Sequence, residues 1–160
     1  MIETPQAIIG RDGISPIRAF VDAMKGRCRG VHFGTYDYTA GCNVTAACQT
    51  MANPVCDFAK HVMQVSLAGT PVMLSDGATN IFPITTHSGE NRENIYRAWR
   101  ISYNHIRHSL ETGYYQGWDL HPAQLPIRYV AVYAFFLESY EQAANRLKSF
   151  VEKAAKATLV

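Results

Sequence analysis

Short apolar runs alternate with longer segments of helical periodicity along this chain, and this alternation constrains the fold more than any other feature. Runs typical of β-strands cover residues 1–4, 30–34, 70–74 and 115–120. Apolar residues at helical spacing follow each of these runs. Strands that alternate with helices form parallel sheets through right-handed crossovers. The pattern therefore predicts an α/β fold, formed as one domain over residues 1–160.

Boundary signals mark the predicted helices. Ser15 and Pro16 are typical of an N-cap followed by the first helical residue, and Asn53 with Pro54 repeats this pattern. Gly69 is placed to end the second of these helices in a left-handed conformation.

Apolar stripes on the predicted helices identify side chains that we expect to be buried. They consist of Ile17, Phe20, Val21 and Met24 in the first helix and of Val55, Phe58, Ala59, Val62, Met63 and Val65 in the second. A third helix is predicted from Ser88 to a point before Gly113. The rest of the chain, from about residue 126, is predicted to be helical with a break near residues 138–140. The charges between residues 138 and 156 indicate a solvated helix face.

Composition excludes several classes of protein. The chain has 160 residues, of which 48% are hydrophobic, so a packed core is expected rather than disorder. A net charge of +2, with no basic run, argues against nucleic-acid binding. No apolar stretch is long enough for a membrane span, and the N-terminus lacks the pattern of a signal peptide. We therefore expect a cytoplasmic protein.

Four cysteines support the same compartment, because thiols stay reduced in the cytoplasm. The spacing of Cys28, Cys42, Cys48 and Cys56 matches no zinc module. A metal site formed by the last three with His61 is therefore disfavoured. We expect these thiols to act as small buried apolar groups.

Acidic or polar residues lie at the end of every predicted strand or just after it, and they are the candidates for function. They are Glu3, Asp37, the pair Ser75 and Asp76, and Asp119 with His121. The carboxyl ends of parallel strands lie on one side of a sheet and carry the chemistry of such folds. Two carboxylates at neighbouring strand ends, Glu3 and Asp37, are suited to a hard divalent cation. No glycine-rich nucleotide-binding loop follows any of the strands.

Each candidate also has a purely structural interpretation. Glu3 could be a solvated carboxylate near the terminus, and Asp37 could form a turn or cap before the next helix. Ser75 and Asp76 are candidates for substrate binding, but they could also only form a polar turn with Gly77.

The histidines are weaker candidates. His121 precedes Pro122 and is held extended, so it could simply shape its loop. For Asp119 and His121 we expect support of neighbouring site residues rather than catalysis. His32 alternates with two apolar neighbours and is predicted to be a hydrogen-bonded core residue. Surface or packing roles are expected for the helical histidines, which are His61, His105 and His108.

Three motifs resemble those of one enzyme family. Residues 1–7, Met-Ile-Glu-Thr-Pro-Gln-Ala, resemble the strand-five motif of the class II pyruvate aldolases and the citrate lyase beta subunit. Residues 34–38, Gly-Thr-Tyr-Asp-Tyr, resemble the strand-six motif of that family. Residues 117–124 contain His-Pro-Ala-Gln and are similar to the strand-eight motif of the citrate lyase branch. The three motifs occur in the family's order and together span nearly the whole chain.

The resemblance implies a fold and an activity. The fold would be the C-terminal half of a (β/α)8 TIM barrel, equivalent to strands five to eight, with C-terminal helices. Glu3 and Asp37 would be ligands of Mg²⁺ or Mn²⁺, and Gly34 and Thr35 would contact a substrate carboxylate through backbone N–H groups. The reaction would be a carbon–carbon lyase step on a 2-oxo acid through a metal-stabilised enolate. A coenzyme A thioester would be an alternative substrate class, supported only by the last motif.

The resemblance also implies what is missing. The family's barrel has eight strands, and the arginine and histidine of its earlier strands have no counterpart here. We therefore expect a truncated barrel with two unpaired strand edges, which favours a homo-oligomer or a partner chain that completes it. The alternative function is a catalytically inactive half-barrel that serves as an assembly module. Whether the chain is itself an enzyme stays open at this point.

Overall fold

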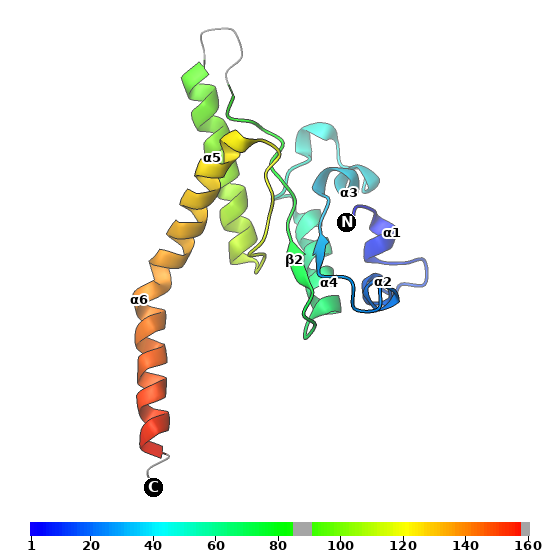
Figure 1. The fold of residues 1–160 in the computed structure, drawn as a ribbon. Coiled ribbons are helices and arrows are strands. Elements are labelled where there is room, and N and C mark those ends of the chain that lie inside the picture. The colour runs from blue at the N-terminus through cyan, green and yellow to red at the C-terminus, as the bar shows by residue number, and fades with distance from the viewer. Residues whose placement is uncertain (85–90, 158–160) are drawn as a thin grey trace.

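The computed structural model describes residues 1–84 and 91–157. The helices in these ranges are α1 (Pro5–Ile8), α2 (Ile17–Ala23), α3 (Thr35–Gly41), α4 (Pro54–Leu67), α5 (Asn91–Glu111) and α6 (Leu125–Ala157). The strands are β1 (Gly30–His32) and β2 (Met73–Ser75), and the short 3-10 turns are η1 (Ala46–Cys48) and η2 (Pro122–Gln124). Helices α1 to α4 pack around the strands, α5 and α6 pack against each other, and the C-terminal half of α6 projects away from the rest (Figure 1).

Four extended segments lie side by side, all parallel and in chain order. β1 pairs with β2 in parallel, and an isolated parallel bridge joins each of them to a further segment. Ile2 bridges to Phe33 beside β1, and Ser75 bridges to Gln116 beside β2. The Ile2 N–H donates to the His32 carbonyl at 2.8 Å, and the Asp76 N–H donates to the Gln116 carbonyl at 2.9 Å. The α/β fold expected from the sequence is confirmed, with parallel order throughout.

The regular strands are shorter than predicted. The predicted strands at residues 1–4 and 115–120 are reduced to single bridges, and the third begins at Met73 rather than at residue 70. Pro71 has no N–H to donate to a ladder, and Thr70 folds back to bond the Leu67 carbonyl. The pairing therefore starts only after these two residues.

Helix boundaries follow some of the sequence signals and not others. The Asn53 side chain accepts from the Val55 N–H at 3.1 Å, and Gly69 has a φ of +72°, so both signals around α4 are confirmed. The N-cap predicted at Ser15 is wrong, because Pro16 occupies the cap of α2. The Ser15 hydroxyl instead accepts a hydrogen bond from Ser66 at 3.2 Å. The cap predicted at Ser88 lies outside the described residues.

Helix α6 is continuous, so the break expected near residues 138–140 is wrong. Its sequence from residue 127 to 157 contains neither proline nor glycine, the residues that interrupt helices most strongly. In the described part of the chain, no helix is long and apolar enough to cross a membrane.

The main core lies between the parallel segments and the N-terminal helices. It is formed by Ile2, Ile8, Ile17, Val31, Phe33, Tyr38, Cys56, Ala59, Met63 and Leu67. Of the stripe predicted on α4, Ala59 and Met63 are buried, whereas Phe58 and Val65 are 55% and 80% exposed. The buried face of α4 is rotated relative to the prediction because it includes Lys60, which an ion pair holds in the interior.

Further burial predictions are wrong. Phe20 and Met24 of the first predicted stripe are 49% and 45% exposed. His32 is exposed, because it points to the opposite face of the sheet from the buried Val31 and Phe33. Only Cys56 among the free cysteines is buried, and Cys48 is exposed on its short 3-10 turn.

Candidate functional site

A cavity of about 130 Å³ opens where the parallel segments end. Its walls come from the first three of these segments and from the stretch after Gln116. The lining residues are Met1, Glu3, Phe33, Gly34, Thr35, Tyr36, Asp37, Gly77, Ala78, Trp118 and Leu120. The structure thus brings together four residues singled out from the sequence: Glu3, Gly34, Thr35 and Asp37.

Two glycines make this close arrangement sterically feasible. A Cβ atom on residue 34 would overlap Cγ of Glu3 and lie 2.8 Å from its Oε1. A Cβ atom on residue 77 would overlap Oγ1 of Thr35 and lie 3.3 Å from the Phe33 carbonyl oxygen. Side chains at these positions would therefore displace Glu3 and Thr35 from the cavity wall.

Asp37 lies inside a helix rather than at the end of a strand. Gly34 is the extended N-cap of α3, and Asp37 is the acidic residue of its first turn. The structural alternative for Asp37, a turn or cap before the next helix, is therefore wrong, because the helix begins at Thr35. A carboxylate in the first turn is favoured by the helix dipole and points from the helix end at which the cavity opens.

Tyr36 connects α3 to the opposite wall of the cavity. The Tyr36 hydroxyl donates to the Ala78 carbonyl and accepts from the Asn80 N–H, both at 2.9 Å. Oγ1 of Thr35 is buried and has no hydrogen-bond partner within the described part of the chain. The contacts of Tyr36 could not be predicted from the sequence, because both partners lie more than forty residues away.

Asp76 is placed behind the cavity rather than in it. Its carboxylate pairs with Nζ of Lys60 at 3.0 Å and accepts from the Ser109 hydroxyl at 2.7 Å. The Gly77 N–H donates to its second oxygen at 2.8 Å. Ser75 is also buried, and its hydroxyl donates to the Asp76 carbonyl at 3.2 Å. Neither side chain lines the cavity that contains Glu3 and Asp37.

Lys60 extends this buried network to the surface of α4. Its Nζ lies 3.2 Å from Oδ1 of Asp57, which His108 contacts through Nε2 at 2.8 Å. Burial alone would raise the pKa of Asp57, but the bond from His108 and the charge of Lys60 lower it below its usual value. The sequence pattern alone did not predict this network. The signal was a lysine placed among the apolar residues of the α4 stripe, directly after Ala59.

Asp119 and His121 hold the segment after Gln116 in place. Arg128 donates to both carboxylate oxygens of Asp119, at 2.6 and 3.0 Å. The His121 Nδ1 accepts from the Ala123 N–H at 3.1 Å, in a capping box with Gln124. These contacts position the neighbouring Trp118 and Leu120, which do line the cavity.

His105 of α5 joins two loops through its side chain. Its ring nitrogens lie 2.9 Å from Oγ1 of Thr50 and 2.9 Å from Oγ1 of Thr79. Burial lowers the pKa of His105, so the folded chain holds the neutral ring.

We expect this histidine to make folding stability depend on pH. Its folded pKa is below its unfolded value, so its contribution is complete above about pH 6.5 and is lost as the pH falls toward the folded pKa. Denaturant unfolding at several pH values should show a fall in the unfolding free energy on acidification. The fall should be smaller in His105→Gln. The exposed His61→Gln is the matched control and should behave as the unaltered chain. If the unfolding free energy falls equally in all three chains on acidification, His105 is not the cause of the pH dependence.

Glu3 and Asp37 are the two carboxylate residues that line the cavity. Within residues 1–84 and 91–157, no group of three or more His, Cys, Asp or Glu residues is close enough to hold a metal ion. Mg²⁺ commonly keeps several waters and uses one or two protein carboxylates together with substrate oxygens. A two-carboxylate site is therefore compatible with this ion.

Comparison with known proteins places the chain among α/β proteins with a citrate-lyase-like fold. A citrate lyase from Burkholderia xenovorans LB400 superposes with a TM-score of 0.55 and 17% sequence identity, over 82% of this chain and 36% of that protein. The chain thus spans little more than a third of the length of that lyase. It belongs to the family described as Domain of unknown function (DUF6986), whose model matches residues 1–160. No curated protein matches the sequence.

Proposed function

We propose that this chain is the metal-binding part of a carbon–carbon lyase of the citrate lyase or aldolase type. Glu3 and Asp37 would hold Mg²⁺ or Mn²⁺ at the carboxyl ends of the parallel segments. One observation carries the proposal: both carboxylates line the same small cavity, together with Gly34 and Thr35. The fold shared with a citrate lyase supports it.

The residues present fit a hard divalent cation. Carboxylate oxygens are the ligands that Mg²⁺ and Mn²⁺ prefer. A cavity of about 130 Å³ has room for an ion with a few waters or a small substrate group, given about 30 Å³ per water. The buried, unpartnered Oγ1 of Thr35 in the cavity wall would gain a partner from such a water or substrate oxygen.

The chain's own groups would bind and orient the substrate. The backbone N–H groups at the start of α3, from Thr35 on, would donate to a substrate carboxylate, and Gly34 allows its close approach. Phe33, Trp118 and Leu120 would form apolar walls that exclude water. A bound cation would supply Lewis-acid stabilisation of the negative charge that develops on a 2-oxo acid. Ser75 and Asp76 would shape the loop that carries Gly77.

None of the residues that line this cavity in the described chain is basic. General acid–base groups would therefore come from residues other than those that line this cavity. The parallel segments, which pair in chain order, would be equivalent to strands five to eight of a (β/α)8 barrel.

A second candidate function is assembly. In the described residues, the segment at Ile2 and the segment at Gln116 each have a pairing neighbour on one side only. Beside Ile2, an apolar cavity of about 400 Å³ is lined by Ile17, Phe20 and Val21 of α2. Unpaired edges next to apolar surface favour a partner that continues the sheet. The chain would then contribute a surface for barrel completion rather than chemistry.

Calorimetric titration with Mn²⁺ and with Mg²⁺ tests the metal proposal. The unaltered chain should bind one ion with saturable heat. Glu3→Gln and Asp37→Asn should each weaken binding by at least about tenfold, because each removes a charged ligand. Asp22→Asn is the matched control, since Asp22 is an exposed carboxylate on α2, paired with Arg18. Absence of binding, or binding unchanged in both site variants, would contradict the proposal.

A further inference from the structure

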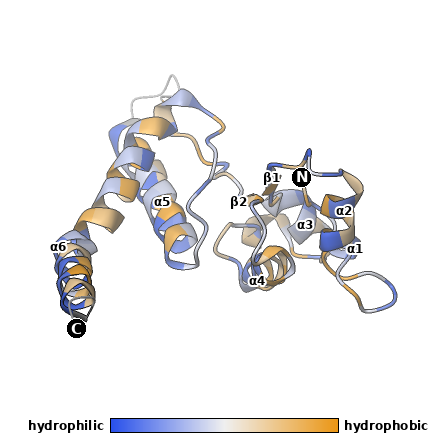
Figure 2. Ribbon diagram, turned by 60° about the horizontal axis from the view of Figure 1, so that its bottom comes forward, coloured by the Kyte–Doolittle hydropathy of each residue, from blue (hydrophilic) through white to orange (hydrophobic). Residues whose placement is uncertain are grey.

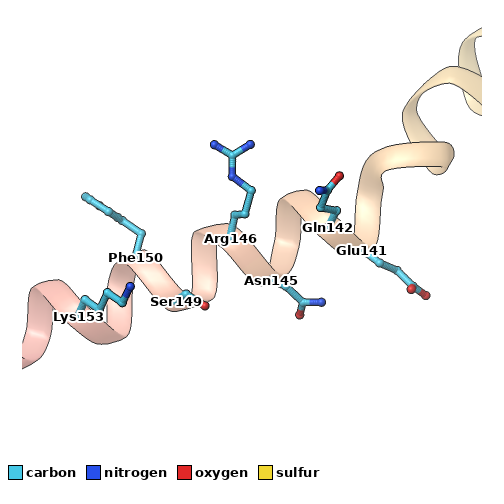
Figure 3. A pocket seen from close by; sticks show the side chains of 7 residues that line it. All are labelled: Glu141, Gln142, Asn145, Arg146, Ser149, Phe150 and Lys153. Carbon is cyan, nitrogen blue, oxygen red and sulfur yellow. The ribbon is translucent and has the colours of Figure 1, made fainter.

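The C-terminal half of α6 exposes large apolar side chains. Every residue from 136 to 156 is exposed, including Leu147 at 64% and Phe150 at 70%. In Figure 1 this half of the helix extends beyond the rest of the molecule, and in Figure 2 hydrophobic and hydrophilic residues alternate along it. Figure 3 shows Phe150 and Arg146 standing out from the helix. The surface in that view is formed by α6 alone, so it is an open helix face and not an enclosed site.

The exposed residues follow a heptad pattern. With residue 137 at position a, the a and d positions are all apolar, at spacings of three and four residues: Leu137, Tyr140, Ala144, Leu147 and Val151. The g positions are apolar as well: Phe136, Ala143 and Phe150. The b, c and f positions are polar: Glu138, Ser139, Gln142, Asn145, Arg146, Ser149, Glu152 and Lys153. This division is typical of a helix that packs lengthwise against another helix.

The a and d residues from Leu137 to Val151 form a seam along the helix. Residue size along this seam favours an antiparallel partner of the same sequence. If Ala144 faces Leu147 of a second copy, Tyr140 faces Val151 of that copy, and both layers occur twice by symmetry. Each layer then joins a larger side chain to a smaller one. On one flank, Ala143 lies within one turn of Phe150 of the second copy. In a parallel pair each residue faces the same residue of the other copy. A layer of two Ala144 side chains would then lie next to a layer of two Tyr140 side chains, so no layer would join a larger side chain to a smaller one.

Charge favours the same orientation. The e positions are Glu141 and Lys148, and e positions face each other across an antiparallel pair. In the alignment set by the apolar layers, Glu141 lies within one turn of Lys148 of the second copy, and the reverse pair forms by symmetry. In a parallel pair these charges would face the apolar g positions instead.

We propose that the C-terminal half of α6 is a self-association surface, on which two copies of this chain pair antiparallel through the seam from Leu137 to Val151. The partner is a second copy because the seam is complementary to itself in both size and charge. This inference is independent of the metal site at Glu3 and Asp37. It also differs from barrel completion, which would use the sheet edges.

Sedimentation equilibrium of the 160-residue chain tests the inference, with circular dichroism to monitor helix content. The unaltered chain should show a reversible monomer–dimer equilibrium. Leu147→Glu should leave a monomer, because it places two charges in the seam. Glu141→Lys should weaken the dimer by about tenfold, since two opposite-charge pairs become two like-charge pairs. The double variant Glu141→Lys with Lys148→Glu should restore the affinity to within about twofold.

Glu152→Lys makes the same charge change at a b position and is the matched control, with association unchanged. A chain that stays monomeric at every concentration would overturn the inference. A dimer unaffected by Leu147→Glu would do the same, since it would form through another surface such as a sheet edge. If Glu141→Lys weakens the dimer and the added Lys148→Glu does not restore its affinity, the antiparallel orientation is overturned. Monomers that bind anionic lipid vesicles through Leu147 would assign the surface to membranes and also overturn it.

Discussion

Replacing Lys60 with methionine is expected to lower the free energy of unfolding by about 3–5 kcal/mol, the usual cost of breaking a buried ion pair from one side. Lys60 and Asp76 are each 1% exposed, and Nζ lies 3.0 Å from the carboxylate. Methionine keeps most of the side-chain length and removes the charge. The Asp76 carboxylate would remain buried with only the Ser109 hydroxyl and the Gly77 N–H as donors. Denaturant unfolding measures the loss.

Two further variants separate the buried pair from charge effects in general. Lys60→Met combined with Asp76→Asn removes both charges and should recover much of the loss. Arg18→Met breaks the exposed pair with Asp22 on α2 and should change the unfolding free energy by less than about 1 kcal/mol. Equal effects of the Lys60 and Arg18 changes would contradict a buried, structural ion pair.

Phe33→Ala is expected to cost about 3–5 kcal/mol of unfolding free energy, as for other fully buried phenylalanines. Phe33 is 0% exposed and contacts the Tyr38 ring edge-on, at 5.2 Å between centroids. Its backbone bridges to Ile2, and its N–H donates to the Ser75 carbonyl at 2.9 Å. The side chain also forms part of the cavity wall, so its loss would enlarge the candidate site.

Phe58→Ala is the matched control for this experiment. Phe58 is on α4 and is 55% exposed, so its removal should cost less than about 1 kcal/mol. The sequence pattern alone assigned it to the buried stripe of α4. A loss of unfolding free energy in Phe58→Ala as large as in Phe33→Ala would contradict the assignment of Phe58 to the exposed face of α4.

Local signals predicted the parallel order of the extended segments and the longer helices, but not the short helices α1 and α3. The alternation of strand and helix, the cap at Asn53 and the left-handed Gly69 depend on residues adjacent in sequence, and all three are confirmed. Strand length and helix rotation depend on distant partners. The burial of Lys60 follows from Asp76 on the next parallel segment, and this changed which side chains of α4 face the core.

The candidate site was predictable only in part. Glu3 and Asp37 could be expected to lie near each other from their places after neighbouring parallel segments, and both line one cavity. The sequence could not show that Asp76, also at a strand end, is engaged by Lys60 and Ser109 behind that cavity. The contacts of Tyr36 with Ala78 and Asn80 depend on the tertiary fold in the same way.

Paramagnetic broadening by Mn²⁺ in amide NMR spectra tests most directly whether this cavity holds a metal ion. Substoichiometric Mn²⁺ should broaden the backbone signals of Gly34, Thr35 and Ala78 and the Trp118 indole signal, because these groups line the cavity. The broadening should disappear in Glu3→Gln. Broadening centred elsewhere, or persisting in that variant, would contradict a metal site formed by Glu3 and Asp37.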